Sequence, residues 1–421
     1  MNWQNKKIHC VGIKGSGISG LAILLKNEGA IISGSDTAEE FPSEKELAKN
    51  NIEIKLFSAE NISKEIDLVI YSSAWTEEHE ERAKAKELGI EELSYAEALV
   101  KYAEGKEVIV VTGTHGKTTT TALLGQIFES GERDPNVLTG DAVKAWDSSV
   151  RAGKGKYFII EGDEYQEKFA MFSPAGAIIP SLDYDHTDYF KTPEDYKNSF
   201  KHWIEKNPGM KFVTTKEVQS SLDVPATLSD ESDEKIFARA NFIFPGEHYR
   251  QNALLAIKLS RLFGIPEEKI IEGINSFKGV GRRLDFYTPE RGDFVVVYDY
   301  AHHPVEIKAT LKALKEKYGG YKIVAIFQPH TFTRTKAFLN EFAQAFGDAD
   351  EVYFEEIYSS AREKKPDISI EDLIRETGRY KKAQHLSDFD LKNFAPPTLF
   401  VFMGAGDIWQ KAKKIAGLLG A

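Results

Sequence analysis

The stretch EVIVVTGTHGKTTTTA, residues 107–122, decides the fold of this chain. It opens with an apolar run typical of a buried strand and closes with a helical pattern. Between them, Gly113 and Gly116 allow a tight turn whose backbone N–H groups can face an anion, and the N-terminus of the following helix adds partial positive charge. Lys117 can reach a terminal phosphate, and the hydroxyl of Thr118 can bind Mg²⁺. The stretch therefore predicts a phosphate-binding turn, in a G-x-x-G-K-T form shorter than the usual motif.

Composition excludes several classes of protein. The chain has 421 residues, 42% of them hydrophobic, which predicts about two to four domains with substantial cores. Its formal charge of −11 argues against nucleic acid as a partner, because a phosphate backbone needs a basic surface. The single cysteine, Cys10, cannot form an internal disulfide, which fits the cytoplasm. We find neither an N-terminal signal peptide nor an apolar run long enough to span a membrane, and we expect a monomer or weak homodimer.

A second glycine turn lies near the N-terminus. The apolar run at residues 7–13 leads into GSGISG, residues 15–20, and a second predicted strand ends at Asp36. This spacing is typical of a dinucleotide-binding turn, with the acidic residue near a ribose. The alternative is a tight turn that only packs a helix against a strand. A further buried run at 66–71 ends in the loop 72–74, where parallel sheets place their ligands.

Two later strands each end in residues that can bind a metal ion. One ends at Glu161, and the other leads through Asp185 to His186. Because these strand ends meet at one edge of a parallel sheet, we expect Glu161 and His186 to complete a Mg²⁺ site begun by Thr118, with His186 acting directly or through water. The alternative for His186 is a turn histidine bonded to Asp185. The 130–156 stretch, after the helix that follows the phosphate-binding turn, is polar and Gly-rich.

The last third of the chain repeats the α/β alternation. A segment with two glycines and two arginines, residues 279–285, predicts a hinge, and strands are expected at 295–299, 322–327 and 398–403, with helices at 305–318 and 336–346. His302, His303 and Arg334 follow strand ends, where arginine suits bidentate binding of a carboxylate. The alternative for the histidines is a surface pair. Asn252 lies near a predicted helix start, where capping is a simpler role.

Together these motifs resemble the ATP-dependent Mur ligases of peptidoglycan synthesis. The matching segments span nearly the whole chain in order: GIKGSGISGLA, SGSD, SSA, TGTHGKTTTTALL, EGDE, DYDHTDYF, GEHYRQN, FKGVGRRLDFY, YDYAHHPVEI, FQPHTFTRT, EIYSSAREK and MGAGDI. The resemblance implies three α/β domains: a Rossmann-like UDP-binding domain at 1–105, a P-loop ATPase-like domain at 106–285 and a Rossmann-like domain for the amino acid at 286–421. It implies UDP-N-acetylmuramate and L-alanine as substrates, with ATP and Mg²⁺ as cofactors.

The resemblance also assigns roles residue by residue. The UDP-sugar and its acyl group would contact Gly15, Ser16, Gly17, Ser19, Asp36, Ser72, Ser73, His115 and Tyr300. ATP would contact Gly113, Thr114, Gly116, Lys117, Thr118, Asn252, Arg283 and Asp299. Thr118, Glu161 and His186 would hold Mg²⁺. Catalysis would involve Lys117, His186, His302, His303 and Arg334, and the group that deprotonates the amine is His186 or one of the other two histidines.

Some residues depart from the family's pattern and keep alternatives open. Tyr165 follows EGDE, and Tyr249 stands where the family has the first asparagine of G-x-H-N-x-x-N. Tyr165 at this position is similar to the family members that attach a whole murein tripeptide to the same sugar. The segments GSGISG and TFTRT are similar to the members that attach L-alanine, and we favour this second branch. A P-loop kinase and a non-catalytic UDP-sugar sensor are the rival classes. A sensor need not retain Lys117 or the Mg²⁺ ligands.

Overall fold

The structure is a computed structural model that describes residues 2–186, 189–359 and 368–420. It contains three β-sheets with helices between their strands, so the predicted α/β class is confirmed. By contacts the chain forms two compact units: residues 1–242 with 252–280, and residues 243–251 with 281–421. Residues 187–188 and 360–364, parts of two segments that carry the family resemblance, lie outside the described residues.

The first sheet has the strand order β3-β2-β1-β4-β5, and all its neighbours are parallel. Its strands are β1 Lys7–Val11, β2 Ile31–Asp36, β3 Ile54–Leu56, β4 Leu68–Tyr71 and β5 Glu91–Ser94. Its helices are α1 Ser16–Asn27, α2 Ser43–Lys49, the 3-10 turn η1 Ala59–Asn61, α3 Glu80–Glu87 and α4 Tyr95–Ala103. The run predicted to extend to residue 13 ends at Val11, because Gly12 turns the chain with φ +78°.

The second sheet has the order β11-β10-β6-β9-β7-β8 and is parallel except for the β7–β8 pair. Its strands are β6 Glu107–Val111, β7 Asn136–Val143, β8 Ser148–Arg151, β9 Tyr157–Glu161, β10 Gly176–Ile179 and β11 Lys211–Thr214. Its helices are α5 Lys117–Ser130, the 3-10 segment η2 Tyr165–Met171, α6 Pro193–Lys206, α7 Lys216–Leu222, α8 Glu231–Arg239, α9 Glu247–Leu262 and α10 Glu267–Ser276. The polar, Gly-rich stretch 130–156 contains the antiparallel β7–β8 pair.

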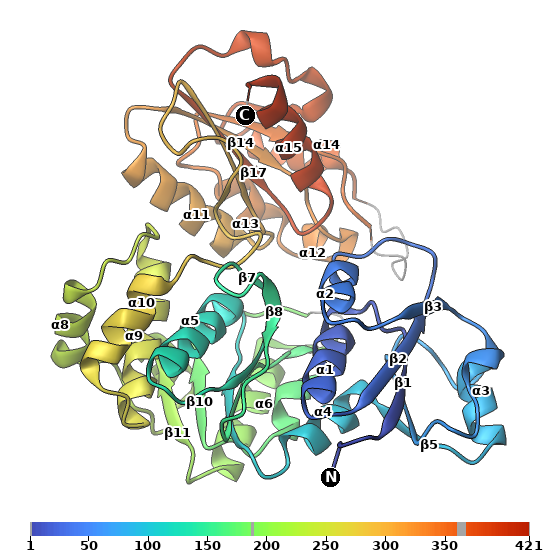
Figure 1. Ribbon diagram of the computed structural model, residues 1–421. Helices are drawn as coiled ribbons and strands as arrows, with labels where there is room; N and C mark the ends of the chain where they lie inside the picture. The colour runs from blue at the N-terminus through green and yellow to red at the C-terminus, as the bar shows by residue number, and fades with distance from the viewer. Residues whose placement is uncertain (1, 187–188, 360–367, 421) are drawn as a thin grey trace. The chain divides into compact units, whose positions relative to one another are not determined.

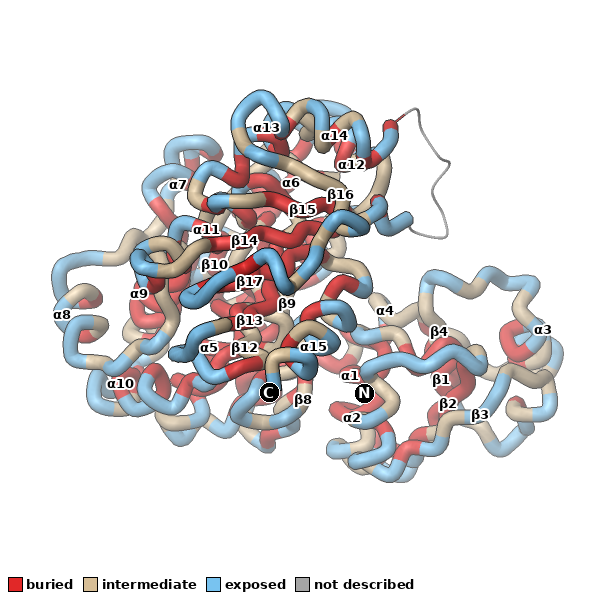
Figure 2. The backbone as a smooth tube through the Cα atoms, turned by 90° about the horizontal axis from the view of Figure 1, so that it is seen from above, coloured by how far each residue is buried: buried red, intermediate tan, exposed pale blue. Residues whose placement is uncertain are grey.

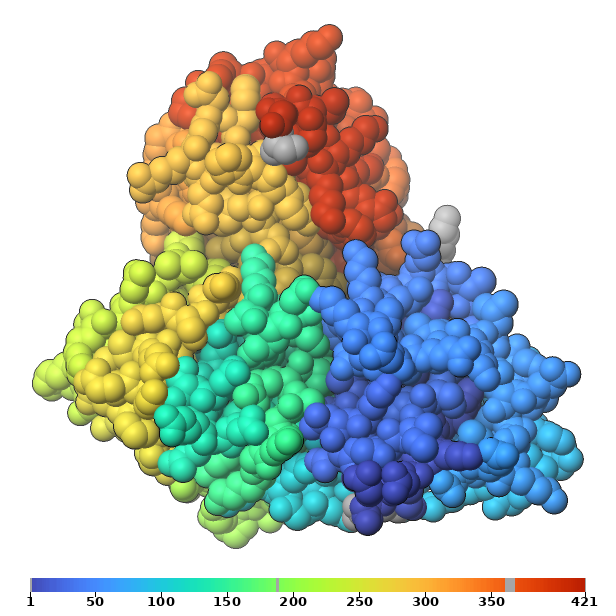
Figure 3. All heavy atoms as spheres, viewed as in Figure 1, coloured from blue at the N-terminus to red at the C-terminus, as the bar shows by residue number. Residues whose placement is uncertain are grey.

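One continuous hydrophobic core joins the first two sheets. It includes Leu21 of α1, Leu138 of β7 and Val150 of β8. Gly20 explains the close approach, because a Cβ there would collide with Leu138 and lie 3.1 Å from Val150. Figure 1 shows α1 beside β7 and β8, and in Figure 3 the blue and green residues of these parts form one continuous surface. The last glycine of GSGISG thus allows α1 to pack closely against β7 and β8, and the ligand-binding role of the turn stays a prediction.

The second unit contains the third sheet, with the order β12-β13-β17-β14-β15-β16. Only β12 is antiparallel to its neighbour. Its strands are β12 Asp285–Phe286, β13 Phe294–Asp299, β14 Lys322–Phe327, β15 Glu351–Phe354, β16 Ala383–His385 and β17 Thr398–Met403. Its helices are α11 Pro304–Lys317, α12 Phe332–Ala337, α13 Leu339–Gln344, α14 Ile370–Thr377 and α15 Ile408–Leu418, with 3-10 turns η3 Leu386–Asp388 and η4 Leu391–Asn393. The central strands β13, β14 and β17 are buried, as the red tube in Figure 2 shows.

The second unit bears on two predictions, the helix at 336–346 and the hinge at 279–285. The single helix expected at 336–346 is instead the pair α12 and α13, because Phe338 leaves helical geometry at φ −115°. The boundary between the units falls after Val280, inside the segment predicted as a hinge, and Arg282 and Leu284 there have positive φ. Hinge motion itself stays a prediction, as do the domain limits at 105 and 285.

Candidate functional site

The predicted phosphate-binding turn joins β6 to α5. Gly113 has φ +110° and Gly116, at the N-cap of α5, has φ +80°, conformations that favour glycine. A Cβ at Gly116 would lie 2.6 Å from the Oδ1 atom of Asn252, and one at Gly113 would collide with the carbonyl oxygen of Ser181. The start of α5 has neither a side-chain cap nor an acidic residue in its first turn. Its first backbone N–H groups are therefore well placed to bind an anion.

Not every N–H group of the turn faces an incoming anion. The amide of Thr114 donates to the carbonyl oxygen of Ser181 at 3.1 Å, and that of His115 donates to the Ser181 hydroxyl at 2.8 Å. The Thr114 hydroxyl lies 2.6 Å from the carbonyl oxygen of Asp183 and 2.9 Å from the hydroxyl of the buried Tyr196. The loop after β10 is thus fastened to the phosphate turn. The sequence analysis gave no role to Ser181 or Tyr196.

Lys117, the first residue of α5, lies inside this turn. Its Nζ atom donates to the carbonyl oxygens of Gly113 at 2.8 Å and Thr114 at 2.9 Å, and it lies 2.9 Å from a carboxylate oxygen of Glu164. Burial acts to lower the pKa of Lys117, but Glu164 and neighbouring carboxylates outweigh it and hold that pKa above its ordinary value. The ammonium group is therefore charged and held at the helix N-terminus, where phosphate charge would be neutralised.

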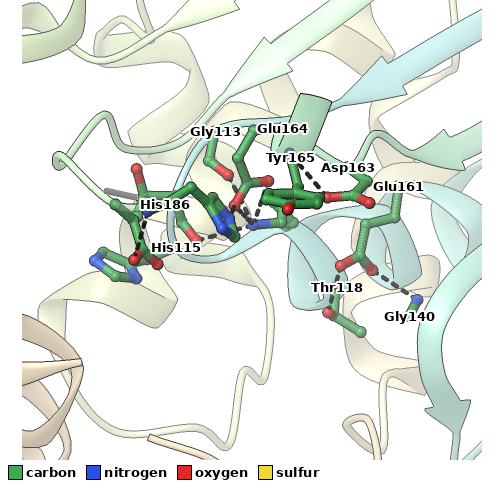
Figure 4. A network of polar contacts seen from close by, with 12 residues as sticks. Gly113, His115, Thr118, Gly140, Glu161, Asp163, Glu164, Tyr165 and His186 are labelled. Carbon is green, nitrogen blue, oxygen red and sulfur yellow. Dashed lines mark hydrogen bonds and ion pairs between the residues drawn. The ribbon is translucent and has the colours of Figure 1, made fainter. Parts of the chain in front are cut away.

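Glu164 connects Lys117 to His186. It is only 4% exposed, and its Oε1 atom lies 3.0 Å from Nε2 of His186 (Figure 4). Burial raises the pKa of Glu164, but Lys117 and His186 more than offset this and keep it below the ordinary value. Burial likewise acts to lower the pKa of His186, whereas the bond to Glu164 raises it, and the net shift is upward. The backbone N–H of His186, not its ring, bonds to Asp185. The contact with Asp185 that the turn-histidine alternative expected is therefore present, and the ring contact with Glu164 is additional to it.

Thr118 and Glu161 form the second half of the site. The Thr118 hydroxyl donates to Oε1 of Glu161 at 3.0 Å, and the amide of Gly140 donates to the other carboxylate oxygen at 2.7 Å (Figure 4). Two hard oxygen groups beside a phosphate-binding turn fit Mg²⁺, which keeps several waters and takes its other ligands from phosphates. Across the described residues, no three or more His, Cys, Asp or Glu side chains gather in a way that could hold a metal ion. His186 pairs with Glu164 instead.

The first glycine turn carries the predicted UDP-sugar residues. Gly15 is the N-cap of α1, Ser16 begins the helix, and the Ser19 hydroxyl donates to the carbonyl oxygen of Ser16. This helix, too, has no side-chain cap and no acidic residue in its first turn. The carboxylate of Asp36 accepts the amide N–H of Lys14 at 2.7 Å, so it closes the turn in this structure.

Two more residues near this turn come from the end of β4. Ser72 donates its amide N–H to Val11, and the exposed Ser73 follows it. The indole of Trp75 packs against Gly12. Ser72 and Ser73 thus lie at the same end of the sheet as the glycine turn, as expected for neighbouring parallel strands.

In the second unit, the predicted residues cluster after β13. The buried carboxylate of Asp299 accepts amide N–H groups from Leu284 and Ala301, both at 2.9 Å, and burial raises its pKa. Nδ1 of His303 caps α11, and this side chain is 4% exposed, so the surface-pair alternative is wrong for it. Nδ1 of His302 lies 3.3 Å from Glu306.

Arg282 and Arg283 lie beside Tyr300, which follows β13 directly. The guanidinium of Arg283 lies 4.8 Å from the ring centre of Tyr300, and that of Arg282 lies 4.5 Å from it. Arg334 lies on α12, after β14. Asn252, by contrast, belongs to the first unit and lies inside α9, five residues beyond its start and 5% exposed, so the capping alternative is wrong.

Comparison with known proteins places three family models along the chain. These are the Mur ligase family catalytic domain at residues 7–107, the Mur ligase middle domain at 111–220 and the Mur ligase glutamate ligase domain at 282–406. A protein of Desulfitobacterium hafniense named UDP-N-acetylmuramate–L-alanine ligase is 36% identical over 97% of this chain and 99% of its own length. One of the same name from Caldanaerobacter subterraneus is 38% identical, with 97% of both chains covered.

Solved structures show the same fold. The UDP-N-acetylmuramate-alanine ligase MurC of Thermotoga maritima is 26% identical, with a TM-score of 0.78 over 98% of this chain and 99% of its own. A murein peptide ligase of Psychrobacter arcticus is 21% identical, with a TM-score of 0.67 over 98% of this chain. The second likeness shows the fold alone.

Proposed function

Because the chain belongs to the Mur ligase family, we infer that it is an ATP-dependent ligase that joins L-alanine to the lactyl carboxylate of UDP-N-acetylmuramate, a step of peptidoglycan precursor synthesis. The carboxylate attacks the γ-phosphate of ATP and releases ADP. The amine of L-alanine then attacks the acyl phosphate, phosphate leaves, and the amine loses a proton. Binding and orienting the charged groups supplies most of the catalysis in such phosphoryl transfers.

The observation that carries this proposal is the Lys117 ammonium held at the start of α5 beside Thr118 and Glu161. Lys117 and the helix N-terminus would neutralise the γ-phosphate as charge develops on it. Thr118 and Glu161 would hold Mg²⁺, which supplies further neutralisation when bound. Asn252, packed against Gly116, would contact the nucleotide. We propose that Arg283 and Asp299 of the second unit also contact the nucleotide.

The proton of the attacking amine requires a base, and three histidines were candidates. Nδ1 of His303 accepts the amide N–H of Val305 as a helix cap, so that nitrogen is in use. His186 has the arrangement of an oriented base, because Glu164 holds one ring nitrogen and leaves the other to accept a proton. We therefore propose His186 as the base and treat any contact with Mg²⁺ as water-mediated. His302 and Arg334 would face the amino acid.

Three further proposals concern the residues that bind the UDP-sugar, the cellular compartment and the oligomeric state. We propose that Gly15, Ser16, Gly17, Ser19, Asp36, Ser72 and Ser73 hold the UDP-sugar, and that His115 and Tyr300 face its acyl group. We propose that the protein works in the cytoplasm as a monomer or weak homodimer. No helix within the described residues combines the length and apolarity that crossing a membrane requires.

Phosphate release is the decisive assay. Purified protein with ATP, Mg²⁺ and UDP-N-acetylmuramate should release phosphate when L-alanine is added, and glycine, L-serine and the murein tripeptide should support much slower release. Faster release with the tripeptide would assign the chain to the recycling branch. Phosphorylation of the sugar without an amino acid would indicate a kinase, and sugar binding without ATP turnover would indicate a sensor. Lys117→Ala should abolish release while circular dichroism shows an intact fold.

A further inference from the structure

Tyr95 lies where the first two sheets of the first unit meet, and the sequence analysis gave it no role. It is the first residue of α4, directly after β5, and a capping box between Ser94 and Glu97 fixes its backbone. Its ring packs against Gly17 in the first glycine turn. A Cβ built on Gly17 would lie 2.7 Å from Cζ and 2.8 Å from the hydroxyl oxygen of Tyr95. The tyrosine hydroxyl is therefore placed beside the uncapped start of α1.

Carboxylates of the second sheet also act electrostatically on Tyr95. Burial, together with the charges of Asp163 and Glu161, raises the pKa of Tyr95 above its ordinary value. Glu161 is the partner of Thr118 in the proposed ATP site. Tyr95 thus belongs to the first sheet but lies within electrostatic reach of the second sheet's carboxylates. Its neutral hydroxyl can donate a hydrogen bond to an anion without adding negative charge there.

The Tyr95 hydroxyl has no hydrogen-bond partner anywhere in the described part of the chain, although the ring is packed and its backbone is capped. Tyr102, two turns later on α4, offers a contrast. Its hydroxyl also lacks a partner, but the side chain is 2% exposed and packs edge-on against Phe158 in the core, 5.2 Å between ring centres. Tyr95, by comparison, is only partly buried and lies against Gly17 of the first glycine turn.

We propose that the Tyr95 hydroxyl donates a hydrogen bond to an oxygen of bound UDP-N-acetylmuramate and thereby positions this acid between the first glycine turn and the Thr118–Glu161 pair. This inference rests on the proposed function. It adds a substrate-positioning residue that the glycine motif does not include. Gly17 then has a second purpose beyond its turn, since any side chain there would displace the tyrosine ring from the substrate.

The test compares Tyr95→Phe with Tyr102→Phe, which removes an unpartnered hydroxyl from the same helix. Calorimetric binding of UDP-N-acetylmuramate, without ATP or L-alanine, should weaken about tenfold or more in Tyr95→Phe, the usual effect of losing a hydrogen bond to a charged or strongly polar group. Its KM for the sugar should rise in parallel, while the KM values for ATP and L-alanine and the melting temperature stay at wild-type values. Tyr102→Phe should leave every value unchanged.

Each other outcome has a definite meaning. Wild-type binding by Tyr95→Phe would overturn the inference, and so would an equal rise in all three KM values with a lowered melting temperature, because the hydroxyl would then be structural. If wild-type protein binds the sugar but releases no phosphate, the proposed ligase activity fails, yet the binding comparison still decides the role of Tyr95. If wild-type protein does not bind the sugar at all, both the proposed substrate and this inference are rejected.

Discussion

The ammonium group of Lys117 lies 2.9 Å from a carboxylate oxygen of Glu164, and both side chains are largely buried. The same carboxylate lies 3.0 Å from the ring of His186. Phosphate oxygens that approach Lys117 must therefore share its charge with Glu164. One acidic side chain thus links the residue proposed to stabilise phosphoryl transfer with the residue proposed to accept the proton of the amine.

Replacing Glu164 by glutamine should separate these two effects. The KM for ATP should fall, because Lys117 would keep its full charge for the phosphates. The value of kcat should fall by about 100-fold, because His186 would lose the carboxylate that orients it as a base. Steady-state kinetics with varied ATP measures both. Glu167→Gln, in the adjoining η2 segment and only partly buried, serves as the control. Unchanged kcat in Glu164→Gln would contradict the linking role.

The sequence predicted the strand and helix that flank the phosphate-binding turn, but not which side chains contact Lys117. The apolar run before Gly113 and the helical pattern after Lys117 have one dominant period each, so β6 and α5 were predictable. Glu164 was not, because EGDE contains three acidic residues and no spacing rule says which one meets Lys117. That choice depends on the 3-10 segment η2, where Gln166 and Glu167 have positive φ.

Other features depended on tertiary contacts that local sequence does not encode. NVLTGDAV, residues 136–143, contains Gly140 and Asp141, which disfavour a strand, yet it pairs with β9 and packs Leu138 against Gly20. Asn252 looked like a cap because polar residues surround it, but α9 begins at Glu247 and buries it against Gly116. Burial by a partner from elsewhere in the chain overrode the local signal in both cases.

Arg334 should bind the carboxylate of L-alanine. Arg334→Ala should raise the KM for L-alanine by about 10- to 100-fold, the usual effect of losing a charged, bidentate hydrogen bond. The KM for ATP should change little, since Arg334 is assigned only to the amino acid. Lys336→Ala, an exposed cation on the same short helix, controls for a general loss of positive charge. Equal increases in both KM values for Arg334→Ala would argue against this anchoring role.

Cys10 should be inert in the folded protein. It is fully buried in β1, and burial raises the pKa of its thiol from 9.0 to about 12. At pH 8 a thiol-specific reagent should therefore react fully only after denaturant is added, and the signal is unambiguous because the chain has one cysteine. Because the pKa of the Cys10 thiol is higher in the folded protein than in the unfolded chain, its contribution to the free energy of unfolding is complete below pH 9.0. This contribution is lost as the pH rises toward about 12. Rapid stoichiometric labelling of native protein would contradict this.

Alanine substitutions at Gly116 and Gly105 can distinguish two effects of an added side chain, which are strain in a left-handed backbone and collision with a neighbouring residue. Both have φ +80°, but a Cβ at Gly116 would lie 2.6 Å from Asn252, whereas nothing lies within 4 Å of one at Gly105. Each substitution by alanine should therefore cost about 1–2 kcal/mol of unfolding free energy for the left-handed backbone alone. Gly116→Ala should in addition displace Asn252 and weaken binding of ATP, measured by calorimetry, while Gly105→Ala should bind ATP normally. Equal ATP affinities in the two variants would show that Asn252 takes no part in binding the nucleotide.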